Sequence, residues 1–149
     1  MNNKKIDFIR EWVYEGNNDL GLAEFVIENN GKYYDLVCFH CQQAAEKYLK
    51  AYIIYLQLYY RKVHDLTYLL NVIKRKKEIP KKLIKKAEML EEYAIDSRYP
   101  DHWHDPTLNE TEECIEAAKM FKEFIKPVFD FIIKKDENLK IDHDINKNN

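Results

Sequence analysis

The chain has 149 residues, of which 46% are hydrophobic and 34% are charged, and its formal net charge is −2. These values are typical of one folded domain, exclude a disordered chain, and exclude a global electrostatic attraction for nucleic acid. With only 3 glycines and 4 prolines, the chain has little turn material for many short strands, so a few long helices are expected.

The compartment is predicted from three features that concern membranes and cysteines. The first residues lack the apolar stretch of a secretory signal, and no apolar run reaches the roughly 20 residues that a spanning helix needs. The three cysteines are an odd number without a disulfide framework. We therefore expect a cytoplasmic protein with no membrane partner.

The first two segments both have apolar residues three or four positions apart, as in helices. The first, from Ile6 to Asn29, is interrupted by Gly-Asn-Asn-Asp at residues 16–19, where we expect a kink or a short break. The second, from Tyr34 to Leu58, has one uninterrupted apolar stripe. At about 37 Å it would be the central helix of a bundle.

Two shorter helices are predicted next. The third segment runs from Asp65, a plausible N-cap, to Lys77. Pro80 suits the first turn of a fourth helix. That helix must end by Tyr99, because the residue before Pro100 disfavours helical geometry.

The last predicted helix follows a loop at residues 101–109. Thr107 or Asn109 is expected to cap it, and Pro127 is expected to kink it. The fold class is therefore all-α, an antiparallel up-and-down bundle of four to five helices. We assign residues 1–135 to this bundle and the polar residues 136–149 to a disordered tail.

The charges are unevenly distributed along the chain. Residues 61–86 carry ten Lys or Arg against two acidic residues, whereas residues 87–123 carry eleven Asp or Glu against three basic residues. One interpretation is two solvated helix faces that attract each other. The other is a basic surface for RNA or for an acidic partner.

Two motifs resemble those of the prokaryotic HEPN domain family, over about residues 6–133. The first is CFHCQQAAEKYLKA at residues 38–51, followed by Val-His-Asp-Leu at 63–66, and the second is Ser-Arg-Tyr-Pro-Asp at 97–101. The resemblance implies a helical bundle that forms a homodimer and is paired with a minimal nucleotidyltransferase, as in toxin–antitoxin systems. Many members are metal-independent ribonucleases that use an Arg and a His four to six residues apart, across the dimer. Others bind nucleotides or partners only.

The candidate catalytic residues that the resemblance implies are Arg98 and His104, six positions apart. Histidine can move protons near neutral pH, and arginine can stabilise charge on a phosphate, so RNA cleavage would need no metal. Two positions depart from the family pattern, with Tyr99 directly after the arginine and Pro106 two residues after the histidine. Catalysis, nucleotide or partner binding, and a structural role therefore all stay open.

Further residues are candidates for binding a nucleotide or a partner, with a solvated helix face as the alternative. They are Tyr99, His102, His40, Gln43 and Lys47. Glu46 and Lys50 form an i,i+4 pair, which is worth only a few tenths of a kcal/mol on a helix surface.

No metal or cofactor is predicted. Residues 102–105 contain two histidines and an aspartate, but one short loop offers no second group of ligands. Cys38 and Cys41 form C-x-x-C inside a helix, which favours packed thiols over a redox pair. Tyr55, Tyr59 and Tyr60 would suit a dimer interface or, less favourably, base stacking.

Overall fold

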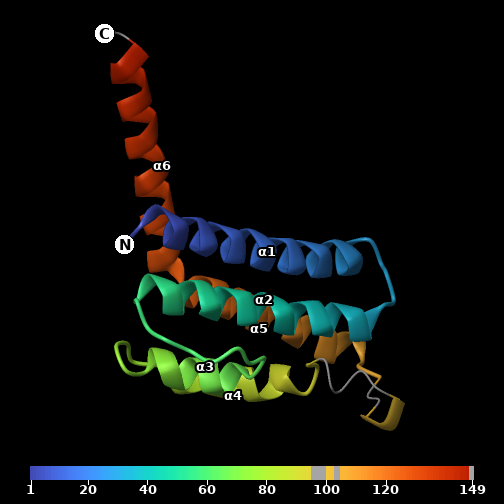
Figure 1. The fold of residues 1–149 in the computed structure, drawn as a ribbon. Helices are drawn as coiled ribbons and strands as arrows, with labels where there is room; N and C mark the ends of the chain where they lie inside the picture. The colour runs from blue at the N-terminus through green and yellow to red at the C-terminus, as the bar shows by residue number, and fades with distance from the viewer. Residues whose placement is uncertain (95–99, 103–104, 148–149) are drawn as a thin grey trace.

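The computed structural model describes residues 1–94, 100–102 and 105–147, and within these ranges every regular element is a helix (Figure 1). The elements are α1 (Asn3–Glu28), α2 (Tyr34–Tyr55), α3 (Leu66–Ile73), α4 (Lys81–Glu91), a 3₁₀ turn η2 (Pro100–His102), α5 (Leu108–Phe124) and α6 (Lys126–Lys147). The predicted all-α class is confirmed. No helix within these ranges has both the length and the hydrophobicity to cross a membrane.

Helix α2 is the central helix of the bundle, as its uninterrupted apolar stripe predicts. It lies between α1 on one side and the pair α3–α4 on the other, with α5 behind it (Figure 1). Its buried residues extend beyond the apolar stripe to Gln42, Glu46 and Lys50. A helix enclosed on most of its circumference has to bury polar side chains as well as apolar ones, and each of those needs a partner.

The predicted kink in α1 does not occur, because α1 is continuous through residues 16–19. Gly16 lies against the ring of Tyr48, and the Tyr48 hydroxyl donates a hydrogen bond to Asn17 Oδ1 (2.9 Å). Asp19 is buried and bonded to side chains of α2. These residues interrupt the apolar pattern because they contact a polar part of α2, and not because the chain turns.

The helix termini follow the predicted capping chemistry. Asp65 caps α3 by accepting a hydrogen bond from the backbone N–H of Tyr68 (2.8 Å). Thr107, not Asn109, caps α5, and it forms a capping box with Glu110. The predicted stop after α1 is also present, since Asn30 adopts a φ of 57° and Gly31 donates to the carbonyl of Val26 (2.7 Å).

Pro127 produces two helices where one kinked helix is predicted. Helix α5 ends at Phe124 and α6 begins at Lys126, with Pro127 in the first turn of α6. Helix α6 then runs away from the bundle (Figure 1). It remains helical to Lys147, which differs from the tail predicted from residue 136. Asp136 explains part of this difference, because it forms an ion pair with Arg10 of α1 (2.6 Å).

The three cysteines are buried free thiols, which confirms the packing interpretation of the C-x-x-C motif. Cys38 lies 3.8 Å from the hydroxyl of Thr111 in α5, and burial raises the pKa of the Cys41 thiol. A protonated, enclosed thiol is a poor nucleophile and a poor metal ligand.

The close contact between α1 and α2 makes Gly16 sensitive to substitution. A Cβ atom at Gly16 would lie 2.8 Å from Cε1 of the buried Tyr48 ring. We expect Gly16→Ala to lower the free energy of unfolding by about 1–3 kcal/mol in urea denaturation. Gly21→Ala is the matched control, because nothing lies within 4 Å of its Cβ and alanine favours the helix by up to about 1 kcal/mol. Equal effects of the two substitutions would contradict this packing.

Candidate functional site

The predicted catalytic residues Arg98 and His104 lie outside the described residues, as does Tyr99. His102 ends the 3₁₀ turn, but its side chain is not among those described. The structure describes the residues on either side of this segment, at the end of α4 and the start of α5.

Both ends of this segment are attached to the bundle. On the α4 side, Tyr93 is buried. On the α5 side, Pro106 is buried, and Thr111 donates a hydrogen bond to the carbonyl of Thr107 (2.8 Å). Thr111 also contacts Cys38, so the first turn of α5 packs against the N-terminal half of α2. The start of α5 therefore lies beside the helix that carries the predicted binding residues.

Two of those predicted binding residues, His40 and Lys47, converge on one carboxylate of α1. His40 Nδ1 lies 2.8 Å from Oδ1 of Asp19, and Lys47 Nζ lies 2.5 Å from Oδ2. Burial opposes the charged form of Asp19, but the hydrogen bonds from His40 and Lys47 outweigh burial and lower the pKa of this carboxyl. These two side chains hold α2 to α1, and their role in binding a nucleotide or a partner stays a prediction.

Gln43 does not join the Asp19 cluster. Its amide nitrogen donates a hydrogen bond to Oε1 of the neighbouring Gln42 (2.7 Å). Gln42 is fully buried, and its own amide nitrogen donates to the backbone carbonyl of His64 (3.3 Å). Gln43 therefore extends a second polar group, which contacts the loop before α3.

This second group surrounds the buried carboxylate of Glu46. Lys50 Nζ lies 2.6 Å from Glu46 Oε1, His64 Nδ1 lies 3.0 Å from the same oxygen, and Gln42 Nε2 lies 3.4 Å from Oε2. Lys50 also lies over the ring of Trp12 in α1, at 4.9 Å from its centroid. The side chains of Glu46 and Lys50 are only 4% and 8% exposed, so this pair is part of the core.

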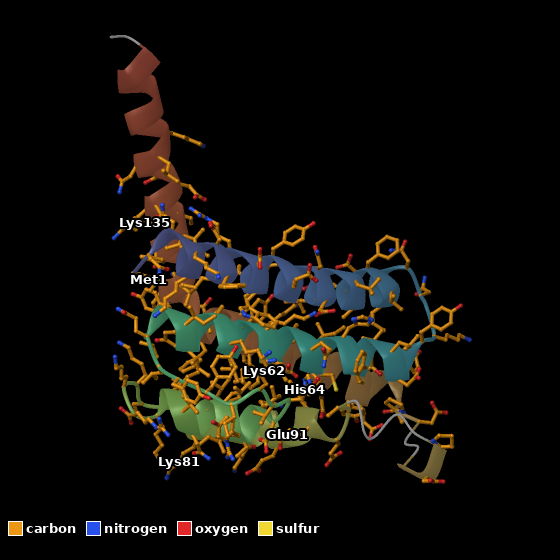
Figure 2. All side chains as sticks on the ribbon, viewed as in Figure 1. Met1, Lys62, His64, Lys81, Glu91 and Lys135 are labelled. Carbon is orange, nitrogen blue, oxygen red and sulfur yellow. The ribbon has the colours of Figure 1, made fainter. Side chains whose placement is uncertain are left out.

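The sequence does not identify the Glu46 group as a site. The i,i+4 spacing of Glu46 and Lys50 predicts only a pair on a helix surface, and His64 directly precedes Asp65, the predicted cap of the third helix. The available signal was the Val-His-Asp-Leu motif at residues 63–66, which accompanies the Gln-rich motif of α2. Figure 2 shows His64 below α2, close to Lys62.

No group of three or more metal-ligating side chains occurs among the described residues. The predicted absence of a metal at residues 102–105 is not tested by this observation, because residues 103 and 104 lie outside the described ranges.

The Asp19 cluster predicts a pH dependence of stability. We expect Asp19→Asn to destabilise the protein by about 1–3 kcal/mol at pH 7, because a charged, buried acceptor of two hydrogen bonds is lost. The pKa of Asp19 is lowered in the folded protein, so its stabilisation is present above the unfolded carboxyl pKa near 3.9 and is lost as pH falls further. The difference between wild type and variant, measured by urea unfolding, should therefore shrink below about pH 4.

Asp7→Asn is the control for this measurement. Asp7 is 63% exposed and pairs with Arg10 on the surface of α1, so its loss should change stability by less than about 1 kcal/mol. A gap between wild type and Asp19→Asn that stays constant from pH 7 to pH 2 would refute the assignment.

Comparisons with known proteins agree with this architecture. The family model "HEPN domain" matches residues 9–128. A protein of Methanocaldococcus jannaschii named "Putative toxin MJ1304" is 27% identical over 144 residues, which cover 87% of this chain and 91% of that protein.

Solved structures with the same fold include TT1696 of Thermus thermophilus, with a TM-score of 0.71 and 26% identity, over 80% of this chain and 97% of that one. ST0689, described as an archaeal HEPN homologue, has a TM-score of 0.65 and 26% identity, over 80% and 95% of the two chains. A HEPN domain protein of Thermotoga maritima shares the fold, with a TM-score of 0.63 and 21% identity, over 80% of this chain and 98% of that one. Because the HEPN domain model matches most of its length, the chain belongs to the HEPN domain family.

Proposed function

We propose that this HEPN protein is the toxin-like member of a two-protein pair and cleaves RNA without a metal ion, using Arg98 and His104 in a homodimer. The observation that supports this proposal is the Arg-x5-His spacing inside the matched HEPN range. The similarity to a protein named as a toxin points in the same direction.

The proposed chemistry is attack of the ribose 2′-oxygen on the adjacent phosphorus. His104 of one subunit takes the 2′-hydroxyl proton, and the bond between phosphorus and the 5′-oxygen breaks. The second His104 gives a proton to the leaving 5′-oxygen, while Arg98 stabilises the negative charge on the phosphoryl oxygens. The products are a 2′,3′-cyclic phosphate and a 5′-hydroxyl, so the step needs no oxidant, metal or water.

A homodimer is supported by apolar side chains that the single chain leaves exposed. Ile133 and Leu139 on the projecting helix α6 are 54% and 60% exposed. On the bundle, Phe25 and Tyr33 near the α1–α2 connection are 62% and 65% exposed. Burial of such side chains against a second copy would be favourable. The proposed second partner is a minimal nucleotidyltransferase, as in pairs of this family.

The proposed activity predicts RNA cleavage in EDTA. The purified protein should degrade single-stranded RNA with excess chelator present, and His104→Ala should lower the rate at least 100-fold, because a general acid–base is lost. His143→Ala is the matched control, since it removes a histidine outside the motif. Undiminished cleavage by His104→Ala, measured by gel electrophoresis of a labelled RNA, would exclude this histidine as a catalytic residue.

The shared active site predicts that His104→Ala subunits inactivate their wild-type partners. Because each cleavage uses His104 of both subunits, a mixed dimer lacks either the base or the acid. A refolded equimolar mixture of wild-type protein and His104→Ala should therefore keep about a quarter of the wild-type rate, since about a quarter of the dimers then have two wild-type subunits. A rate of about one half, as for subunits that act independently, would argue against a site built across the dimer.

The second candidate function is a binding module without chemistry. Tyr99 and Pro106, which depart from the pattern of the ribonuclease members, favour it. Under this alternative the wild-type protein does not cleave RNA, yet it binds a nucleotide in calorimetry or co-purifies with the nucleotidyltransferase.

A further inference from the structure

The loop at residues 56–65, between α2 and α3, has a defined path although it has no regular structure. The backbone N–H of Leu58 donates to the carbonyl of Ile53 (3.0 Å), and that of Arg61 donates to the hydroxyl of Tyr68 (3.1 Å). At its far end, the carbonyl of His64 accepts from the buried Gln42 (3.3 Å). A loop fixed at its beginning, middle and end is preorganised for binding.

The imidazole of His64 is held in one orientation by the buried Glu46. Nδ1 lies 3.0 Å from the carboxylate, and an ionised carboxylate only accepts hydrogen bonds, so Nδ1 carries a proton. In the neutral ring, Nε2 is then a hydrogen-bond acceptor. The side chain is 63% exposed, so this acceptor is on a ring that reaches the solvent.

Stability of the core does not account for this arrangement. Lys50 already balances the charge of Glu46 at 2.6 Å, and both side chains are buried. An exposed histidine adds little apolar burial and, as a surface contact of a carboxylate, contributes little stability. The contact therefore orients the solvent-facing ring of His64, although Lys50 already balances the charge of Glu46 without it.

The same loop presents positive charge and an exposed aromatic ring. Tyr59 is 82% exposed, and Arg61 and Lys62 are exposed. The guanidinium of Arg61 lies over the ring of Tyr68, at 5.2 Å from the centroid, which limits its motion. Lys76 donates to the carbonyl of Leu56 (2.8 Å), so the basic run at residues 74–77 lies beside the start of the loop.

The far end of the loop lies near the end of α4. The carboxylate of Glu91 accepts a hydrogen bond from the backbone N–H of Thr67 (2.7 Å), which joins the last turn of α4 to the first turn of α3. Figure 2 shows Glu91 below His64 and Lys62. The chain enters residues 95–104 four residues after Glu91. Asp65 and Glu91 are acidic side chains at this end beside Glu46, and both accept backbone hydrogen bonds.

We propose that this loop is a binding site for single-stranded RNA in which His64 distinguishes RNA from DNA. His64 Nε2 accepts a hydrogen bond from a ribose 2′-hydroxyl, which DNA lacks. Arg61 and Lys62 contact the neighbouring phosphates, and a base stacks on Tyr59. The choice of RNA as the ligand rests on the proposed function, whereas the arrangement of acceptor, cations and aromatic ring is a property of the loop.

The test compares RNA and DNA binding in the His104→Ala background, so that cleavage does not interfere. Fluorescence anisotropy with a labelled single-stranded RNA and the DNA of the same sequence should show tighter binding of RNA. His64→Ala should weaken RNA binding about fivefold, the value of one hydrogen bond, and leave DNA binding unchanged.

Substitution of the basic residues should affect the binding of RNA and DNA alike. Arg61→Gln and Lys62→Gln should weaken the binding of both nucleic acids, and each should lower the slope of log Kd against log salt by about 0.7. Lys4→Gln is the matched control for the loss of one positive charge. Lys4 is exposed in the first turn of α1, and Figure 1 shows α1 and the pair α3–α4 on opposite sides of α2. Its substitution should change neither affinity.

Three outcomes would overturn the inference: no RNA binding by the parent protein, no effect of His64→Ala, or an equal loss of RNA and DNA binding in that variant. An equal loss with a lower melting temperature would show that His64 only supports the fold. The proposed function fails separately: absence of cleavage by wild-type protein removes catalysis, while a selective loss of RNA binding in His64→Ala would still establish the site.

Discussion

The buried polar side chains of α2 constrain the positions of its neighbours. Removing one partner from a buried ion pair typically costs about 3–5 kcal/mol, because the other charge remains in a poorly solvated place. Glu46 and Lys50 form such a pair in the core, and the amide of Gln42 contacts the same carboxylate. One residue after Glu46, Lys47 needs Asp19 of α1. These requirements fix the register of α1, α2 and the loop before α3 more narrowly than apolar packing alone would.

This constraint also explains which parts of the fold were predictable from sequence. Local chemistry sets the helix starts at Asp65 and Thr107, because a capping residue and its partner lie within three positions of each other. It also sets the stop after α1. The apolar stripe of α2 gives the central helix. In each case the information is contained in one short stretch of sequence.

The features that the sequence mispredicts depend on contacts between residues that are far apart in the chain. Residues 16–19 of α1 contain a glycine and three polar residues, and that pattern is typical of a turn. They remain helical because Tyr48 and Lys47, about thirty residues away, contact them. Likewise, Glu46 and Lys50 read as a surface pair until α1 and the loop at 56–65 enclose them. The effect of Pro127 was underestimated for the same reason, since the direction of α6 depends on tertiary contacts such as that between Arg10 and Asp136.

In the fold, acidic and basic side chains of the chain gather in different places. Acidic side chains of α5 and α1 line a shared groove, with Glu112 and Glu116 from α5 and Glu24 and Glu28 from α1. Among the described residues that line it, Lys119 is the basic one. This groove lies on the α1–α5 side of the bundle, whereas the basic loop lies between α2 and α3. Glu91 of the acidic stretch accepts a hydrogen bond from the backbone N–H of Thr67 in the basic stretch (2.7 Å). An RNA chain would be repelled by the groove and attracted to the loop, which gives it one favoured side of approach.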